Sequence, residues 1–264
     1  MIYYFSGTGN SEAVAKAIAS VTGEELCQVD WQTEAFVDAE VLGFVFPVHA
    51  WGMPKVFENF VRRIDVGMNR PRYVFLIMTC GDDTGLTYNY VSSLLKPKGI
   101  CIDSAWALQM PNTYIAFPFF DVDSPELERE KLIKSQRDTA EIYTTILNRE
   151  KGILKLRPGA MPYVKSHILR PLFMKLLSGD KDFSVTQSCT KCGKCSRVCP
   201  VRNIFMEGEQ SPQWEGHCTD CLACYHSCPT RSIRKGAFSS KKGQYRFRNS
   251  AAWIKGIYSS VVGK

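Results

Sequence analysis

Short apolar runs alternate with segments of helical period over the first 150 residues of the chain. Runs that are apolar throughout, with no polar alternation, are typical of parallel strands that are covered on both faces. These runs predict five strands, at residues 2–5, 25–30, 41–46, 73–78 and 102–110. Strands that alternate with helices predict an α/β fold, a doubly wound parallel sheet with helices on both faces.

Helical periodicity marks the segments between and after these strands. A first helix is predicted after residue 11, and others at residues 55–64, 88–95 and 125–148. The last of these is long and amphipathic, and we expect it to close the unit. The residues that share one side are Val14, Ala15, Ile18 and Ala19 in the first helix and Leu132, Gln136, Ala140, Tyr143 and Leu147 in the last.

The first strand runs into a turn rich in glycine and hydroxyl groups, where the first helix begins. A helix N-terminus with free N–H groups, approached closely through glycine, binds phosphate. The candidate binding residues are Ser6, Gly7, Thr8, Gly9, Asn10 and Ser11. The turn lacks the lysine of a nucleoside triphosphate loop and the glycine spacing of an NAD site. We expect another phosphate ligand, with a turn that binds nothing as the alternative.

Two more loops are expected at the same edge of the sheet, because ligands of such sheets bind beyond the carboxyl ends of the strands. One loop follows the third strand and the other follows the fourth. Their candidate binding residues are Pro47, Val48, His49, Ala50, Trp51 and Gly52 in the first and Thr79, Cys80, Gly81 and Asp82 in the second. Trp51 either stacks on the ligand or plugs the turn. His49 donates to the ligand, titrates near neutral pH or caps the strand.

The turn at residues 6–11, Ser-x-Thr-Gly-x-Ser, resembles the phosphate loop of flavodoxins, and Cys-Gly-Asp at residues 80–82 resembles their loop after the fourth strand. The resemblance implies a flavodoxin-like five-stranded sheet in the order 2-1-3-4-5, with FMN as the cofactor. It also implies that Trp51 stacks on the flavin. Asn112 and Tyr114, after the fifth strand, are further candidates for the edge of the pocket.

Two runs of cysteines with the same spacing lie in the last third of the chain. Each reads Cys-x-x-Cys-x-x-Cys-x-x-x-Cys-Pro, from Cys189 to Pro200 and from Cys218 to Pro229. Such runs hold cubane iron–sulfur clusters, and the fourth cysteine of each run ligates the other cluster. Zinc is the alternative, although a zinc site takes four ligands, usually as two separated pairs. A disulfide framework would need an oxidising compartment.

The double run resembles bacterial-type two-[4Fe–4S] ferredoxins, which implies a small α+β domain with two [4Fe–4S] clusters. The ligands that it implies are Cys189, Cys192, Cys195 and Cys228 for cluster one and Cys218, Cys221, Cys224 and Cys199 for cluster two. Short strands at residues 201–204 and 231–233 are expected to cover the clusters, and Trp214 is expected to pack over one of them.

Composition and breaker residues divide the chain into four parts. They are a flavodoxin-like FMN-binding domain (1–150), a basic linker with a connecting helix (151–185), a two-[4Fe–4S] ferredoxin domain (186–234) and a basic tail (235–264). The connecting helix, near residues 163–177 and interrupted at Pro171, packs between the domains or lies on a membrane surface.

Charge is distributed unevenly along the chain, whose formal net charge is +7. Residues 1–150 carry 13 Lys and Arg against 20 Asp and Glu, whereas residues 231–264 carry 9 against none. The two parts face different neighbours, or they dock on each other. Basic residues interleaved with aromatics in the tail can bind nucleic acid, but no nucleic-acid fold is visible and we expect none to bind. No signal segment or membrane-spanning run is seen, which predicts a cytoplasmic protein, in an anaerobe.

The two parts together resemble the flavodoxin–ferredoxin fusion proteins of anaerobic bacteria and archaea. The resemblance implies an electron-transfer protein that passes electrons between two [4Fe–4S] clusters and FMN, and so couples one-electron and two-electron redox partners. A flavin-dependent reductase of a small substrate such as a quinone, fed by the clusters, is the alternative. A pocket roofed by Trp51, Tyr114 and Phe117 would favour the reductase, and an exposed flavin edge near an acidic rim would favour the carrier.

Overall fold

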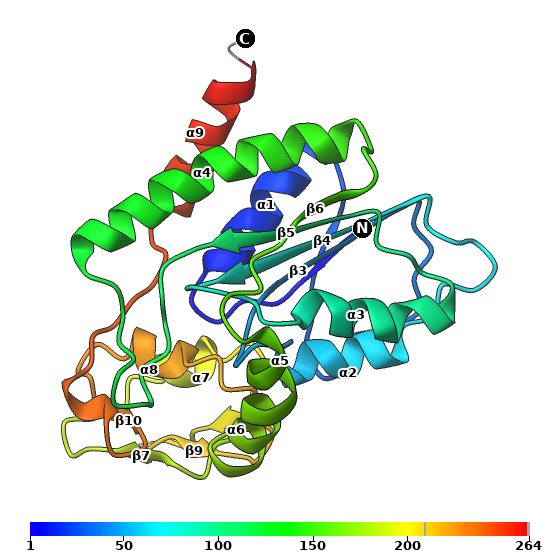
Figure 1. Cartoon of the computed structure of the whole chain (residues 1–264). Coiled ribbons are helices and arrows are strands. Elements are labelled where there is room, and N and C mark those ends of the chain that lie inside the picture. Colours follow the sequence, from blue (N-terminus) through cyan, green and yellow to red (C-terminus); the bar gives the residue numbers. More distant parts are fainter. Residues whose placement is uncertain (209, 263–264) are drawn as a thin grey trace.

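The computed structural model of the chain describes residues 1–208 and 210–262 (Figure 1). Its central element is a parallel sheet in the order β2-β1-β3-β4-β5-β6. The strands are β1 (Ile2–Tyr4), β2 (Leu26–Gln28), β3 (Val41–Pro47), β4 (Tyr73–Cys80), β5 (Ser104–Gln109) and β6 (Ile153–Lys155). The predicted doubly wound α/β fold and the order of its first five strands are confirmed.

The sheet has one strand more than the five that the sequence predicts. Ile153–Lys155 pairs in parallel with the start of β5, in the segment expected to be linker. Apolar periodicity does not mark it, because a three-residue edge strand with two exposed side chains has no apolar run. The sheet therefore reaches past residue 150.

Helices cover both faces of the sheet (Figure 1). One face carries α1 (Asn10–Thr22), α4 (Pro125–Leu147) and α9 (Ser250–Val262), and the other carries α2 (Lys55–Arg63) and α3 (Thr87–Leu95). Every residue of β4 is buried, as expected for a strand with helices on both sides. Short 3₁₀ turns follow α3 (η1, Lys96–Lys98) and lie near the start of the tail (η3, Ser239–Lys241).

Each buried residue of α4 comes one position before a residue of the predicted apolar side. Its buried residues are Lys131, Ser135, Thr139, Ile142 and Ile146, whereas the predicted Leu147 is exposed. Ile142 and Ile146 pack in the core over the sheet, whereas α9 packs beside α4 on the predicted side and leaves it half-buried. Trp253 Nε1 donates to Leu132 O at 3.0 Å, and Gln136 Nε2 donates to Trp253 O at 2.7 Å. The basic tail thus folds back onto the sheet domain.

The connecting segment forms one bent helical rod, made of α5 (Pro162–Val164), a π-helical stretch η2 (Lys165–Leu169) and α6 (Arg170–Leu176). The wide turns precede Pro171, whose ring excludes a normal helical turn before it. The predicted interruption therefore widens the helix without ending it. Within the described residues, no helix is both long enough and apolar enough to cross a bilayer.

The cysteine runs lie in a small α+β unit below the sheet (Figure 1). It contains two antiparallel pairs, β7 (Phe183–Val185) with β10 (Ile233–Lys235) and β8 (Ile204–Phe205) with β9 (Gln213–Trp214). The helices α7 (Lys194–Arg197) and α8 (Ala223–Ser227) each hold the third cysteine of a run. Glu209 and residues 263–264, which fall within the predicted ferredoxin domain and the predicted tail, lie outside the described residues.

Candidate functional site

A cavity of about 840 Å³ lies at the carboxyl ends of the strands, where the loops after β1, β3, β4 and β5 meet. Its volume falls within the range of small-molecule sites, about 300–1,000 Å³. We call it the sheet-edge cavity. Among the predicted binding residues, those that line it are Ser6, Gly7, Thr8, Asn10, Ser11, Pro47, Val48, His49, Ala50, Trp51, Thr79, Cys80, Gly81 and Asp82. The structure thus brings all three predicted loops together.

The remaining two predicted residues, Gly9 and Gly52, do not line the sheet-edge cavity. Gly9 has a φ of 103°, and a Cβ there would lie 3.2 Å from Phe247 of the tail. A Cβ on Gly52 would overlap the guanidinium of Arg170. Both glycines therefore allow a close approach of backbone and neighbour, and neither offers a contact to a ligand.

The turn at residues 6–11 is tied into the loops around it. Ser11 Oγ and Thr79 Oγ1 are 2.8 Å apart, and Asn10 Nδ2 donates to Pro111 O at 3.1 Å. The side chains of Asn10 and Ser11 are thus engaged within the protein. The Thr8 hydroxyl and the N–H groups of the first turn of α1, which have no acceptor within the helix, are the donors that this turn offers to a phosphate.

The tail covers the other side of this turn. Tyr245 Oη donates to Asn10 Oδ1 at 2.7 Å, and Phe247 N donates to Thr8 O at 2.9 Å. The sequence pattern did not predict this support, since the contacts join residues at opposite ends of the chain. The one signal was the uneven charge, which allowed the two parts to dock on each other without indicating where.

The loop after β3 carries Trp51 on a tight turn. His49 N donates to Gly52 O at 2.8 Å and Gly52 N donates to His49 O at 3.1 Å, while Ala50 and Trp51 have φ values of 45° and 58°. This is the backbone of a type I′ turn, in which both central positions favour Asn or Gly. Ala-Trp at these positions is strained, and the surrounding structure must hold it.

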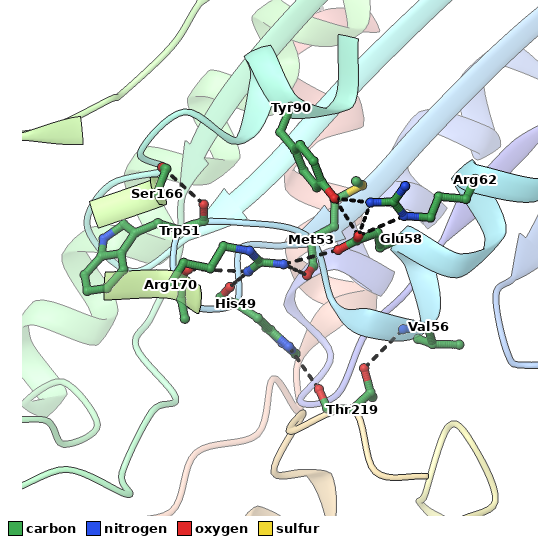
Figure 2. A network of polar contacts seen from close by, with 11 residues as sticks. His49, Trp51, Met53, Val56, Glu58, Arg62, Tyr90, Ser166, Arg170 and Thr219 are labelled. Carbon is green, nitrogen blue, oxygen red and sulfur yellow. Dashed lines mark hydrogen bonds and ion pairs between the residues drawn. The ribbon is translucent and has the colours of Figure 1, made fainter. Parts of the chain in front are cut away.

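Arg170 supplies that support from the connecting helix (Figure 2). Its guanidinium donates to His49 O at 2.6 Å and to Met53 O at 2.9 Å, and it pairs with Glu58 at 3.4 Å. On the far side, Glu58 accepts from Arg62 at 2.9 Å. Burial lowers the pKa of Arg170, and the charge of Glu58 opposes that shift. One buried cation thus fixes both ends of the Trp51 turn.

His49 points from this turn toward the second cysteine run. Its Nδ1 lies 3.2 Å from Thr219 O, and since a carbonyl only accepts, Nδ1 carries the proton (Figure 2). Burial lowers the pKa of His49 to about 4. The interpretation that His49 titrates near neutral pH is therefore wrong; the ring is a neutral donor to Thr219.

The loop after β4 is closed by the loop after β5. Gln109 Nε2 donates to Gly81 O at 3.0 Å, and a Cβ on Gly81 would overlap the Asn112 side chain. Burial raises the pKa of the Cys80 thiol to about 12, so this group stays protonated in the cavity wall. Tyr114 also lines the cavity, and Asn112 lines it beside Gly81.

An apolar roof closes much of the cavity. Two segments form it, the connecting rod and the loop after β5, which meet where Tyr114 contacts both Phe120 and Phe173 at ring-centroid distances of 5.7 Å. The roof residues are Phe117, Phe120, Leu169, Leu172, Phe173, Leu176 and Leu177. The sequence predicted a connecting helix near residues 163–177, but not that its leucines line a cavity.

The first group of cysteines comes from both runs. Cys189, Cys192 and Cys195 surround a small cavity together with Cys228. Cys228 Sγ accepts from Ser232 N at 3.2 Å, a contact that favours a thiolate ligand. The structure thus brings together the four residues that the sequence assigns to cluster one.

The second group lies where Cys199 of the first run approaches the second run. Burial and then the charge of Asp220 raise the pKa of Cys218 to about 12. Burial is also the main cause of the raised pKa of Cys221 and Cys224, and the charges of Cys218 and Cys199 raise both further. Within the described residues, no three His, Cys, Asp or Glu side chains converge on one metal ion. A cubane places each thiolate on a different iron, so its ligands surround the cluster.

The two runs share a backbone pattern as well as a spacing. Left-handed φ values occur in pairs at equivalent positions of the repeat, Lys191 with Asp220 and Arg202 with Arg231. The N–H groups of Lys191 and Asp220 donate to Cys189 Sγ and Cys218 Sγ, both at 3.4 Å. Turns of this kind aim backbone donors at cluster thiolates, so the residues present fit two cubanes.

Comparison with known protein families agrees with this geometry. A family model described as a flavodoxin domain matches residues 1–98, and one described as a 4Fe-4S dicluster domain matches residues 181–229. The chain is a flavodoxin–ferredoxin fusion. No curated protein matches it.

Several solved structures resemble the flavodoxin domain remotely. A flavoprotein from Bacteroides uniformis is 14% identical, with a TM-score of 0.35, over 41% of this chain and 88% of that chain. The Trp repressor binding protein from Bacillus subtilis is 16% identical, with a TM-score of 0.32, over 41% and 82%. An FMN-dependent NADH-azoreductase from Bacillus anthracis is 10% identical, with a TM-score of 0.38, over 56% and 99%. Likenesses this remote say nothing about what the fusion binds.

The ferredoxin domain lies against the loops of the flavodoxin domain that line the sheet-edge cavity. Asp220, Cys221 and Leu222 line the sheet-edge cavity, and His49 donates to Thr219 O. Farther out, Trp31 Nε1 donates to His217 O at 3.1 Å. The second cysteine run therefore faces the flavodoxin domain, whereas no residue of the first run lines the cavity.

Proposed function

We propose that the fusion is an FMN-dependent reductase of a small acceptor, which its two [4Fe–4S] clusters supply with electrons. The flavodoxin and 4Fe-4S domains give the chain an electron-transfer role. One observation supports the finer proposal: Gly7 of the phosphate turn, Cys221 of the second run and the apolar roof all line the same cavity.

The residues for FMN are those of the three loops. The first turn of α1 and Thr8 would hold the phosphate, Trp51 would lie beside the flavin ring, and the loop at residues 79–82 would line its edge. When bound, FMN supplies a centre for one or two electrons, and each cubane supplies a centre for one. Cys221, a proposed ligand of cluster two, lines the same cavity, which supports electron transfer between that cluster and the flavin.

The roof favours a small acceptor over a protein acceptor. The predicted mark of a reductase was a pocket roofed by Trp51, Tyr114 and Phe117, and all three line the cavity. The roof leucines Leu169 and Leu172 extend that cover. The predicted mark of a carrier was an exposed flavin edge near an acidic rim; Asp82, Asp83 and Asp220 do line the cavity, but Asp83 pairs with Lys165 at 2.5 Å and Asp220 pairs with Lys235 at 3.5 Å. An apolar wall of this kind suits a neutral planar acceptor such as a quinone.

The cluster ligands are proposed as the sequence assigned them. Cluster one takes Cys189, Cys192, Cys195 and Cys228, and cluster two takes Cys218, Cys221, Cys224 and Cys199. The proposed domain division also follows the sequence, with two adjustments: β6 joins the flavodoxin domain, and β7 joins the ferredoxin domain through its pairing with β10. A cytoplasmic location in an anaerobe stays a prediction.

The test is anaerobic purification followed by quantification of iron, sulfide and flavin. We expect about eight irons and one FMN per chain. Zinc in place of iron would remove the ferredoxin half of the proposal, and failure to bind flavin after reconstitution would remove the other half. The reduced protein is then mixed with 1,4-benzoquinone or with cytochrome c, and flavin reoxidation is followed by absorbance. Fast reoxidation by the quinone supports a reductase; reoxidation by cytochrome c alone contradicts it.

A substitution in the phosphate turn tests where FMN binds. Gly9→Val places a branched side chain at a φ of 103° against Phe247, so the turn cannot keep its shape. We expect the variant to lose FMN and to keep its iron. Flavin retained at full occupancy would show that the phosphate binds elsewhere.

A further inference from the structure

The two cysteine groups differ in how they face solvent. Cys192 of the first group is exposed, whereas the cysteines assigned to cluster two are buried or half-buried. The second group lies against the sheet-edge cavity, and the first group lies outside its wall. Cluster one is thus the solvent-facing end of the proposed cofactor series, and cluster two is the end beside the flavin.

Cations surround the exposed end. Lys191 and Lys194 line the cavity of the first cysteine group, and among residues 1–208 and 210–262 no acidic residue lines it. Arg197 donates to Cys192 O at 3.0 Å, and Arg231 follows Thr230 of the same wall. We call Lys191, Lys194, Arg197 and Arg231 the basic rim. All four are exposed.

The basic rim is unpaired, in contrast to many cations of the flavodoxin domain. No ion pair within residues 1–208 and 210–262 includes a rim residue. By contrast, Lys16, Arg62 and Lys134 each pair with a carboxylate one helical turn away. The electrostatic field of unpaired like charges is not cancelled within the protein, so it can attract an oppositely charged partner. A field of this kind raises association rates about 10- to 1,000-fold.

We propose that the basic rim docks an acidic one-electron carrier protein, which delivers its electron to cluster one at Cys192. This proposal rests on the function proposed above and names the partner that supplies it. The step balances as a single electron transfer: the carrier is oxidised by one electron, cluster one is reduced by one, and no bond or proton changes place. Two such deliveries supply the two electrons that a quinone-type acceptor takes.

A charge-reversal experiment tests this docking. The holoprotein with Lys191→Glu and Lys194→Glu is compared with wild type and with a matched control, Arg70→Glu and Lys96→Glu. The control residues are exposed and lie at the opposite end of the sheet. The probe is a small acidic two-cluster ferredoxin, used oxidised for binding by calorimetry and photoreduced for stopped-flow reduction. Methyl viologen radical, a cation, is the second reductant.

We expect the rim variant to bind the ferredoxin at least about tenfold more weakly and to be reduced by it about tenfold more slowly at low salt. High salt should remove the difference, because screening acts on surface charges. The control variant should match wild type, and methyl viologen should reduce the rim variant at least as fast as wild type.

Equal binding and equal salt dependence in the rim variant and wild type would overturn the docking proposal. Loss of rate with methyl viologen as well would also overturn it, since that result indicates a damaged cluster. Titration with dithionite distinguishes failure of the docking proposal from failure of the proposed reductase function, because dithionite reduces clusters and flavin without a protein partner. Normal reduction by dithionite with no rim effect leaves the proposed function standing and removes the docking surface.

Discussion

Gly7, in the turn at residues 6–11, packs directly on the backbone of Cys221 in the second cysteine run. A Cβ on Gly7 would lie 2.5 Å from Cys221 O and 2.7 Å from Cys221 Cβ. No side chain fits between the two domains here, and both residues line the cavity in which we propose that the flavin binds. The interface therefore depends on the absence of a side chain at one position.

Gly7→Val should separate the two sites. The clash is with backbone, which yields little, and overpacking of this kind costs about 1–3 kcal/mol. We expect full iron content and slower electron transfer between clusters and flavin, measured by stopped-flow absorbance after rapid mixing with dithionite. Gly23→Asn is the control, since Gly23 lies in open space at the far end of α1 and Asn tolerates its left-handed φ. An electron-transfer rate in Gly7→Val equal to that of wild type would show that this contact does not set the distance between the two proposed sites.

Arg170→Met should weaken FMN binding. Without the guanidinium, the carbonyls of His49 and Met53 lose their donors, and the strained Trp51 turn loses its support. Unsatisfied buried groups cost about 1–3 kcal/mol, so we expect the dissociation constant for FMN to rise about tenfold or more. Quenching of flavin fluorescence on titration into apoprotein measures it.

The matched control for Arg170 is Arg62→Met, on the outer side of the same carboxylate (Figure 2). Arg62 bonds Glu58 but is 52% exposed, and exposed pairs contribute about 0–1 kcal/mol. Its FMN affinity should stay within about twofold to threefold of wild type. Equal losses in the two variants would show that Glu58, and not the Trp51 turn, carries the effect.

Leu172→Trp should narrow the sheet-edge cavity under its roof. Leu172 lines the cavity and is 53% exposed, so the larger ring can enter the space without unfolding the rod. We expect unchanged FMN content and slower flavin reoxidation by 1,4-benzoquinone. Ile168→Trp, on the same rod and 57% exposed but outside the wall, should leave the rate unchanged. Flavin reoxidation by 1,4-benzoquinone at the wild-type rate in Leu172→Trp would mean that the acceptor does not enter the space under the roof.

Cys80 should resist alkylation at mildly alkaline pH. Burial raises its pKa to about 12, so at pH 8 the reactive thiolate is scarce, and labelling should rise only as pH approaches that value. Cys101 is exposed and should react readily. Iodoacetamide labelling of the holoprotein, followed by peptide mass spectrometry, compares the two. Equal labelling at pH 8 would contradict the buried placement of Cys80.

Local patterns were enough for much of the fold and for the chemistry of both sites. Apolar runs predicted β1, β3 and β4 most directly, because strands buried on both faces need apolar side chains throughout. The spacing of the cysteines predicted which residues gather at each cluster site, because it is the spacing that a cubane requires. The turn at residues 6–11 predicted an anion site, since a strand, a glycine turn and a helix N-terminus create one locally.

Local patterns failed where a contact joins distant parts of the chain. β6 is too short for periodicity to show, and α9, which packs beside α4, lies more than a hundred residues later in the chain. In the sequence, Arg170 is one of several basic residues of the linker. Only the fold shows that its guanidinium lies against Gly52.

The sequence by itself determined the two domains and the donor groups that each offers, because those features depend on neighbouring residues. Only the tertiary structure decided that Gly7 meets Cys221, that the connecting rod roofs the cavity and that Cys192 faces solvent. These depend on how two domains pack, and packing is decided by shape and burial among residues far apart in the chain.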